Sequence, residues 1–259
     1  MAGQHATTDA SLRGTIDESE WRARVDLAAC YRLMAIYGMT DLIYNHITAR
    51  VPGQRDQVLI NPYGRLYEEV TASSLLKIDL DGNILGGNGG GYGVNYAGFV
   101  IHSAVHRERH DAECVIHTHT RATMAVSALK EGLLPLSQTS MRFYDRVAYH
   151  AFEGPVVNLE EQARLVADLG DHNVLFLRNH GTLVCAPSVA QAFNIAYFLE
   201  MACKAQVDTL AMDRDIALPS PEIAERTAQN FLSGSEPMGV LEWPAMLRLL
   251  DRRGADYAI

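Results

Sequence analysis

The sequence predicts an α/β protein in which helices cover a mainly antiparallel or mixed sheet, folded as one domain. Short apolar or alternating segments typical of strands are interleaved with segments of helical spacing. Several of these strands follow one another across short turns, as in hairpins, which favours antiparallel pairing. The chain has 259 residues, which is enough for one large domain with a sizeable core.

Two helix starts have a clear sequence signal. Asp17 and Glu20 have the spacing of a capping box and open a helix that ends before Gly38. Ser188 and Gln191 repeat this spacing before a long helix that runs to about residue 212. The other expected helices span 71–76, 95–110, 120–129, 159–169 and 242–253. The expected strands span 43–51, 57–60, 77–80, 84–85, 114–119, 147–152, 174–177 and 182–185.

Three segments lack such patterns. Residues 1–16 are expected to form a mobile N-terminal tail before a single domain at 17–259. The glycine-rich segment 86–93 follows a hairpin and lacks the G-x-G-x-x-G spacing, so a flexible loop is expected there. Residues 213–236 are rich in proline and serine and predict a surface excursion, which makes 213–259 a C-terminal excursion followed by one helix.

Composition excludes several classes of protein. The net charge is −9, and a protein that binds a phosphate backbone needs a basic field, so we expect no nucleic-acid partner. No apolar run approaches the length of a membrane span, and the polar first residues are unlike a secretory signal. The four cysteines form no C-x-x-C pair and are expected to be reduced. These observations favour a cytoplasmic protein without a membrane partner.

The sharpest chemical feature is the segment His117-Thr118-His119 at the end of an expected strand. Alternate residues of a strand point to the same face, so both imidazoles project together. Two such imidazoles form a natural half of a divalent metal site. The alternative is two partly exposed histidines at a strand terminus.

His180 favours the metal site. It lies in the turn Asn179-His180-Gly181, which can lift its side chain toward a neighbouring strand end. Three histidines leave one or more coordination positions open, as a catalytic metal requires. The alternative for His180 is a hydrogen bond to a carbonyl of its own loop.

Three further histidines, His102, His106 and His110, recur every four residues on one helical face. No glutamate completes an H-E-x-x-H motif, so we expect a solvated or packing role for His106 and His110. His102 follows an apolar stretch and is expected nearer the core. The chain has no G-x-S-x-G motif and no cysteine with an evident histidine partner, so it gives little support to nucleophilic catalysis.

Six sequence words resemble the class II aldolase/adducin family over nearly the whole chain. They are YNHITAR at 44–50, NPYG at 61–64, VTASSL at 70–75, HTH at 117–119, LLP at 133–135 and RNHG at 178–181. The segments 95–99 and 246–251 also resemble the globular head of the adducins.

This resemblance implies a three-layer α/β/α fold with a mainly antiparallel central sheet. It also implies a homotetramer with sites near subunit interfaces, and one divalent metal per subunit. The family's three metal-binding histidines fall on His117, His119 and His180. Zinc is the first expectation for the metal, while manganese, iron and cobalt also suit three imidazoles.

The chain also departs from the family pattern. The family's catalytic carboxylate falls on Gly98, which cannot act as a base. The positions of its phosphate cradle read Tyr63-Gly64 and Tyr96-Ala97, while Asn45 keeps the family asparagine. Substrate-binding positions are therefore expected at Asn45, Tyr63, Gly64, Tyr96 and Gly98. For acid–base catalysis, the candidates are His102, Tyr144 and His150.

These residues lead to one functional hypothesis and two alternatives. The hypothesis is a metal-dependent lyase, of aldolase or decarboxylase type, that acts through a metal-stabilised enolate. Its substrate would be a small, non-phosphorylated hydroxy or oxo acid or an aromatic acid that chelates the metal, since the phosphate cradle is lost. The first alternative is a non-haem iron oxygenase on the same scaffold. The second is a non-catalytic, adducin-like assembly module, which the missing carboxylate favours.

Overall fold

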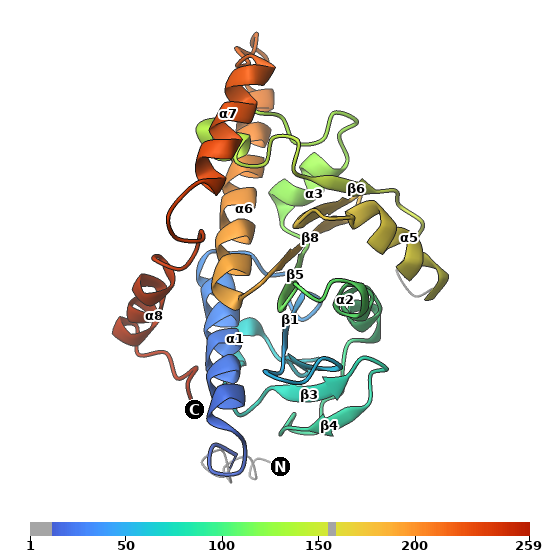
Figure 1. The fold of residues 1–259 in the computed structure, drawn as a ribbon, viewed down its shortest axis with the longest axis vertical. Coiled ribbons are helices and arrows are strands. Elements are labelled where there is room, and N and C mark those ends of the chain that lie inside the picture. Colours follow the sequence, from blue (N-terminus) through green and yellow to red (C-terminus); the bar gives the residue numbers. More distant parts are fainter. Residues whose placement is uncertain (1–11, 155–158) are drawn as a thin grey trace.

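A single eight-stranded sheet runs through the computed structural model, which describes residues 12–154 and 159–259 (Figure 1). The strand order is β4-β3-β2-β1-β5-β8-β7-β6, and every neighbouring pair is antiparallel except β6 and β7. The strands are β1 (His46–Arg50), β2 (Gln57–Ile60), β3 (Leu76–Asp79), β4 (Ile84–Gly86), β5 (Cys114–Thr118), β6 (Ala148–His150), β7 (Val174–Leu177) and β8 (Gly181–Ala186). The mainly antiparallel sheet is confirmed.

Helices cover both faces of the sheet and complete three layers. On one face lie α1 (Glu18–Ile36), α6 (Val189–Ala211) and α8 (Trp243–Arg252), with α3 (Arg121–Ser127) packed on α6. On the other face lie α2 (Tyr96–Glu108) and α5 (Leu159–Leu169), which contact each other. Because strand residues alternate between faces, Ile116 joins the core under α1 and α6, whereas Val115 joins the core under α2 and α5. The predicted α/β/α fold is therefore confirmed.

The sheet register brings distant histidines together. β1 and β5 pair so that His46 lies opposite His117. The turn between β7 and β8 carries Asn179 in the left-handed conformation, with φ 57°. At Gly181 the backbone passes the carbonyl of Thr118 so closely that a Cβ atom would collide with it. This close approach sets the turn against the end of β5.

Two predicted elements differ in the structure. Residues 71–75 form a turn rather than a helix, because the hydroxyls of Thr71 and Ser74 bond to local backbone groups, and residue 76 already belongs to β3. The preceding residues form a short 3₁₀ helix, Tyr67–Glu69. The capping box predicted at Asp17 is also absent, since Asp17 makes no cap and Glu20 is buried against Arg24.

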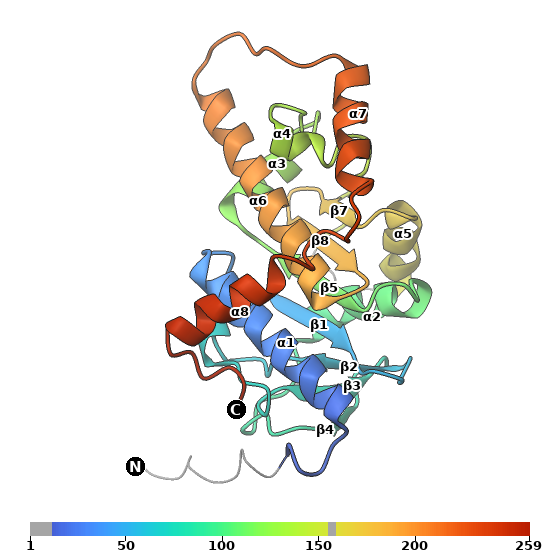
Figure 2. The same cartoon turned by 60° about the vertical axis from the view of Figure 1, so that its left-hand side comes forward.

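The C-terminal segment is more ordered than predicted. Residues 213–236 contain helix α7 (Pro221–Leu232), which begins with Ser220 as its N-cap and Pro221 in its first turn. Ser220 and Pro221, which contributed to the prediction of a loop, therefore begin a helix instead. Figure 2 shows the chain leave α6 through a long loop, form α7 and return to α8 beside α1. A further short helix, α4 (Gln138–Met141), packs near α6 and α7.

Three further predictions concern the N-terminal residues, the cysteines and membrane-spanning helices. In the expected tail, residues 1–11 lie outside the described residues, and residues 12–15 form a turn. The four cysteines are buried and free. Among the described residues, no helix is both long and apolar enough to span a membrane.

Candidate metal centre

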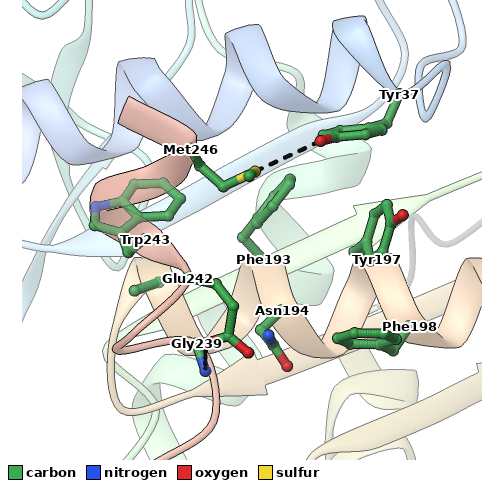
Figure 3. A pocket seen from close by; sticks show the side chains of 10 residues that line it. Tyr37, Phe193, Asn194, Tyr197, Phe198, Gly239, Glu242, Trp243 and Met246 are labelled. Atoms are coloured by element: carbon green, nitrogen blue, oxygen red, sulfur yellow. Dashed lines mark hydrogen bonds between the residues drawn. The ribbon is translucent and has the colours of Figure 1, made fainter. Parts of the chain in front are cut away.

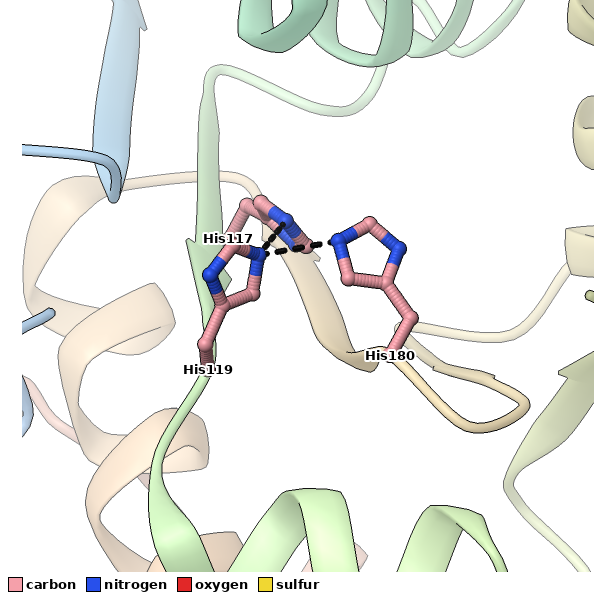
Figure 4. A group of neighbouring side chains, drawn as sticks. All are labelled: His117, His119 and His180. Carbon is pink, nitrogen blue, oxygen red and sulfur yellow. Dashed lines mark hydrogen bonds between the residues drawn. The ribbon is translucent and has the colours of Figure 1, made fainter. Parts of the chain in front are cut away.

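Three imidazoles converge where β5 ends and the β7–β8 turn passes it (Figure 4). The Nε2 atoms of His117 and His119 are 2.7 Å apart, and those of His119 and His180 are 2.9 Å apart. The potential ligand atoms of the three residues all lie within 4.8 Å of one another. The strand alternation places His117 and His119 on the same side, as predicted, and the turn delivers His180 to them.

In His117 and His119, the hydrogen-bond partner of Nδ1 determines which of the two ring nitrogens carries the proton. His117 Nδ1 lies 3.0 Å from the carbonyl oxygen of Thr182, and His119 Nδ1 lies 3.0 Å from Asp41 Oδ2. Both oxygens only accept hydrogen bonds, so each Nδ1 carries the proton and donates it. In the neutral rings, each Nε2 therefore points a lone pair at the other. A cation between them relieves this repulsion, so the residues fit a divalent metal.

Burial keeps two of the ligand rings, those of His117 and His180, in the form that binds metal. It lowers the pKa of His117 well below its usual range, and neighbouring His119 adds to this effect. For His180, burial followed by the proximity of His119 lowers the pKa to about 4. Uncharged imidazole is the metal-binding species, so these two rings are ready to bind at neutral pH.

Next to this centre lies a histidine that the sequence analysis missed. His46 faces His117 across the strand pair, with ring centroids 5.2 Å apart. Its ring stands where a Cβ atom on Gly98 would be. Its Nδ1 is 2.9 Å from Nε2 of His102, which is buried on α2, as its apolar neighbours in the sequence led us to expect. The available signal was the alternation of His46 with Thr48 in one strand.

The predicted substrate positions have different surroundings. Asn45 is buried, and neither polar atom of its amide has a hydrogen-bond partner. Gly64 has φ 111° and packs against the ring of Tyr92, so its backbone excludes larger residues. Tyr63 is half-buried, and Tyr96 is exposed at the start of α2.

Tyr144 and His150 lie elsewhere in the chain. Tyr144 is half-buried in the segment between α4 and β6. His150 is buried on β6, where its Nδ1 lies 2.7 Å from Asp168 and its Nε2 lies 3.4 Å from Glu161, both on α5. These contacts fasten α5 to the sheet edge. The structure therefore does not bring these two candidates together with the three histidines within one chain.

A separate apolar cavity of about 140 Å³ lies between α1, α6 and α8 (Figure 3). Half of its ten lining residues are aromatic, and among them Phe193 and Trp243 are in contact at a centroid distance of 5.9 Å. It lies on the α1 side of the sheet, whereas His46 and His102 lie on the α2 side. The cavity is thus distinct from the histidine cluster.

The fold and the three-histidine set define a three-layer α/β/α protein with a site suited to a divalent metal. The chain belongs to the class II aldolase and adducin family, because residues 25–207 match the family described as "Class II Aldolase and Adducin N-terminal domain". It is 49% identical over 249 residues to a Caulobacter vibrioides protein named "Putative aldolase class 2 protein", with 96% of each chain covered. It is 43% identical to mouse alpha-adducin, where 94% of this chain covers 35% of that protein.

Solved structures agree with this membership. An aldolase II superfamily protein from Pseudomonas syringae superposes with a TM-score of 0.93 and 46% identity, covering 96% of this chain and all of that one. The L-fuculose 1-phosphate aldolase from Glaciozyma antarctica superposes with a TM-score of 0.82 at 25% identity, covering 98% and 96% of the two chains. The resemblance noted from sequence words is therefore confirmed, and family membership supports an aldolase-type lyase in general terms.

Proposed function

We propose that the protein is a metal-dependent carbon–carbon lyase that acts on a small, non-phosphorylated hydroxy or oxo acid. The observation that carries this proposal is the convergence of three imidazole nitrogens, two of which have their opposite nitrogen tied to an acceptor. His117, His119 and His180 would hold one divalent metal, with zinc as the first expectation. When bound, such a metal acts as a Lewis acid that withdraws electrons from substrate oxygens.

Residues of this chain support binding of such an acid. The unpartnered amide of buried Asn45 offers both a donor and an acceptor, and a substrate that meets them removes the cost of leaving a buried polar group unpaired. Tyr63 and Tyr96 fall on hydroxyl positions of the family's phosphate cradle, and the loss of these hydroxyls favours a substrate without phosphate. Gly64 and Gly98 would shape the pocket by lacking side chains.

The assembly and location belong to the same proposal. We infer a homotetramer with the sites near subunit interfaces, in the cytoplasm. Such an assembly is also the setting in which the half-buried Tyr144 of one subunit would act on the site of another, whereas His150 is buried and bonded to Asp168 and Glu161 of its own chain.

Elemental analysis and turnover test the proposal together. Purified protein is expected to hold about one divalent metal per chain, and His119→Ala is expected to lose it. The exposed His110 supplies a matched control, His110→Ala, which should keep the metal. Metal-stimulated cleavage of hydroxy or oxo acids by the wild type supports the lyase. A metal-free wild type without such turnover contradicts it.

The alternative of a non-catalytic, adducin-like assembly module rests on two observations: the likeness to alpha-adducin and the glycine at position 98. If neither wild type nor His119→Ala holds metal, this alternative is favoured. Oxygen uptake by the iron-loaded protein would instead favour the oxygenase, whereas activity under strict anaerobic conditions excludes it.

A further inference from the structure

A buried chain of hydrogen bonds leads from a backbone carbonyl to the edge of the metal centre. The carbonyl oxygen of Ala112 is 3.2 Å from His106 Nδ1, and His106 Nε2 is 2.8 Å from Thr48 Oγ1. The same Thr48 Oγ1 is 2.7 Å from His102 Nδ1. His102 Nε2 is 2.9 Å from His46 Nδ1. The chain thus joins three imidazoles and one hydroxyl.

The carbonyl at one end sets the direction of every bond. A carbonyl only accepts, so His106 Nδ1 carries a proton and its Nε2 accepts the hydroxyl hydrogen of Thr48. Because that hydrogen is used, Thr48 Oγ1 accepts from Nδ1 of His102. His102 Nε2 is then without a proton and accepts from Nδ1 of His46. The proton of His46 is thereby fixed on Nδ1, and its Nε2 keeps a lone pair.

Burial keeps the rings of this chain uncharged. His46, Thr48, His102 and His106 are each at most 3% exposed. Burial lowers the pKa of His106 to about 3, and the charge of nearby Arg50 adds to this effect. Burial also lowers the pKa of His102 well below its usual range. Uncharged rings can pass the direction of hydrogen bonding along the chain.

The ring of His46 lies beside the metal centre. Across the β1–β5 pair this ring neighbours His117, and Gly98 in the first turn of α2 packs against the ring at its Nε2 and Cδ2 atoms. Any side chain at position 98 would collide with this ring. The absence of a side chain there leaves the position beside the centre to an imidazole.

We propose that His46 presents a permanent hydrogen-bond acceptor, Nε2, to a hydroxyl of the substrate, and that His102, Thr48 and His106 are positioning residues that fix its tautomer. This inference rests on the proposed function, because it assumes that a substrate is held at the metal centre. It narrows the substrate class to acids with a free hydroxyl next to the group that binds the metal. A ketone or ether at that place cannot donate to Nε2.

The first test measures the tautomer without any metal or substrate. Solid-state ¹⁵N NMR of histidine-labelled, EDTA-treated protein should show an unprotonated Nε2 for His46, assigned by its loss in His46→Gln. Thr48→Val removes the hydroxyl from this series of hydrogen bonds at nearly constant side-chain size. It should shift the ¹⁵N signals of both ring nitrogens of His46 toward those of a mixture of tautomers. Thr123→Val changes a threonine that is equally buried but bonds only to Thr120, and should leave them unchanged. A protonated Nε2 in the wild type overturns the proposal.

The second test measures how much more tightly the protein binds an acid with a free hydroxyl than the same acid with a methyl ether. Lactate and 2-methoxypropionate both offer a carboxylate and a neighbouring oxygen, but only lactate can donate a hydrogen bond. Visible absorption of the cobalt-loaded protein should show that the wild type favours lactate by about tenfold. This preference should fall to about twofold or less in His46→Leu and Thr48→Val, and should persist in Thr123→Val.

The two tests separate this inference from the proposed function. If the wild type fails to bind cobalt, the proposed function fails, while the NMR measurement still decides the tautomer of His46. If cobalt binds and His46→Leu keeps the full preference for lactate, the metal centre stands and the acceptor role of His46 is overturned.

Discussion

The imidazole of His46 occupies the place that a Cβ atom at position 98 would take. Gly98 lies in the first turn of α2, although glycine is a poor helix former. The two residues are 52 positions apart and fit together only because one of them has no side chain. The ring and the glycine therefore form a matched pair.

This match predicts strong non-additivity between two substitutions. Gly98→Ala should lower the free energy of unfolding by about 2 kcal/mol, because the new methyl group forces the His46 ring to move. In a His46→Ala background the same change should cost nothing, or stabilise by about 0.5–1 kcal/mol, because alanine favours a helix over glycine. Urea denaturation of the four proteins measures the coupling. Equal costs of Gly98→Ala in both backgrounds would show that the ring does not hold this position.

A second prediction concerns the carboxylate behind one metal ligand. Asp41 accepts from Nδ1 of His119, so Asp41→Asn should weaken metal affinity by about 10- to 100-fold. Asp168→Asn is the matched control, because Asp168 has a similar exposure and also bonds to Nδ1 of a histidine, but that histidine is His150. Competition with a chromophoric chelator measures both affinities. Equal affinities in Asp41→Asn and the wild type would contradict the assigned tautomer of His119.

Local patterns in the sequence predict much of the fold and the metal centre. Strand alternation pairs His117 with His119, and the turn at Gly181 allows His180 to join them. The role of His46 escapes such patterns, because its contact with Gly98 depends on how α2 is set against β1. The helix predicted after Asp17 forms, but its predicted capping box does not, since the Glu20 carboxylate is buried against Arg24 and Lys77 instead of bonding to the helix start. Tertiary packing decides these cases.

The buried histidines predict an acid-sensitive fold. Burial lowers the pKa of His106 from 6.5 to about 3, so the unfolded chain binds one more proton at this residue between these values. Stability contributed by this residue is therefore complete above pH 6.5 and is lost as the pH falls toward 3. The slope expected for one such group is about 1.4 kcal/mol per pH unit.

Urea denaturation of EDTA-treated protein between pH 4 and 6 measures this slope. His106→Gln should reduce it by about 1.4 kcal/mol per pH unit, because the substituted residue takes up no proton. His110→Gln, at an exposed position, is the control for the exchange of a histidine for glutamine. A slope in His106→Gln equal to that of the wild type would mean that His106 is already charged in the folded protein.

The unpartnered amide of Asn45 predicts a conflict between stability and binding. A buried polar group without a hydrogen bond is costly, so Asn45→Leu should raise the free energy of unfolding of the ligand-free protein by about 1 kcal/mol. The same change should weaken lactate binding to the cobalt-loaded protein by about tenfold, because the substrate loses its partner. Asn194 is buried at the apolar cavity between α1, α6 and α8, and its Oδ1 has no hydrogen-bond partner. Asn194→Leu should therefore also raise the free energy of unfolding.

Since Asn194 lies on the α1 side of the sheet, Asn194→Leu should leave lactate binding unchanged. Comparing the two variants by urea denaturation and by cobalt absorption separates a general cost of burying an amide from a role in the site. If both variants gain stability and both retain lactate affinity, Asn45 has no part in binding. If Asn45→Leu loses stability, its amide already has a partner in the ligand-free protein.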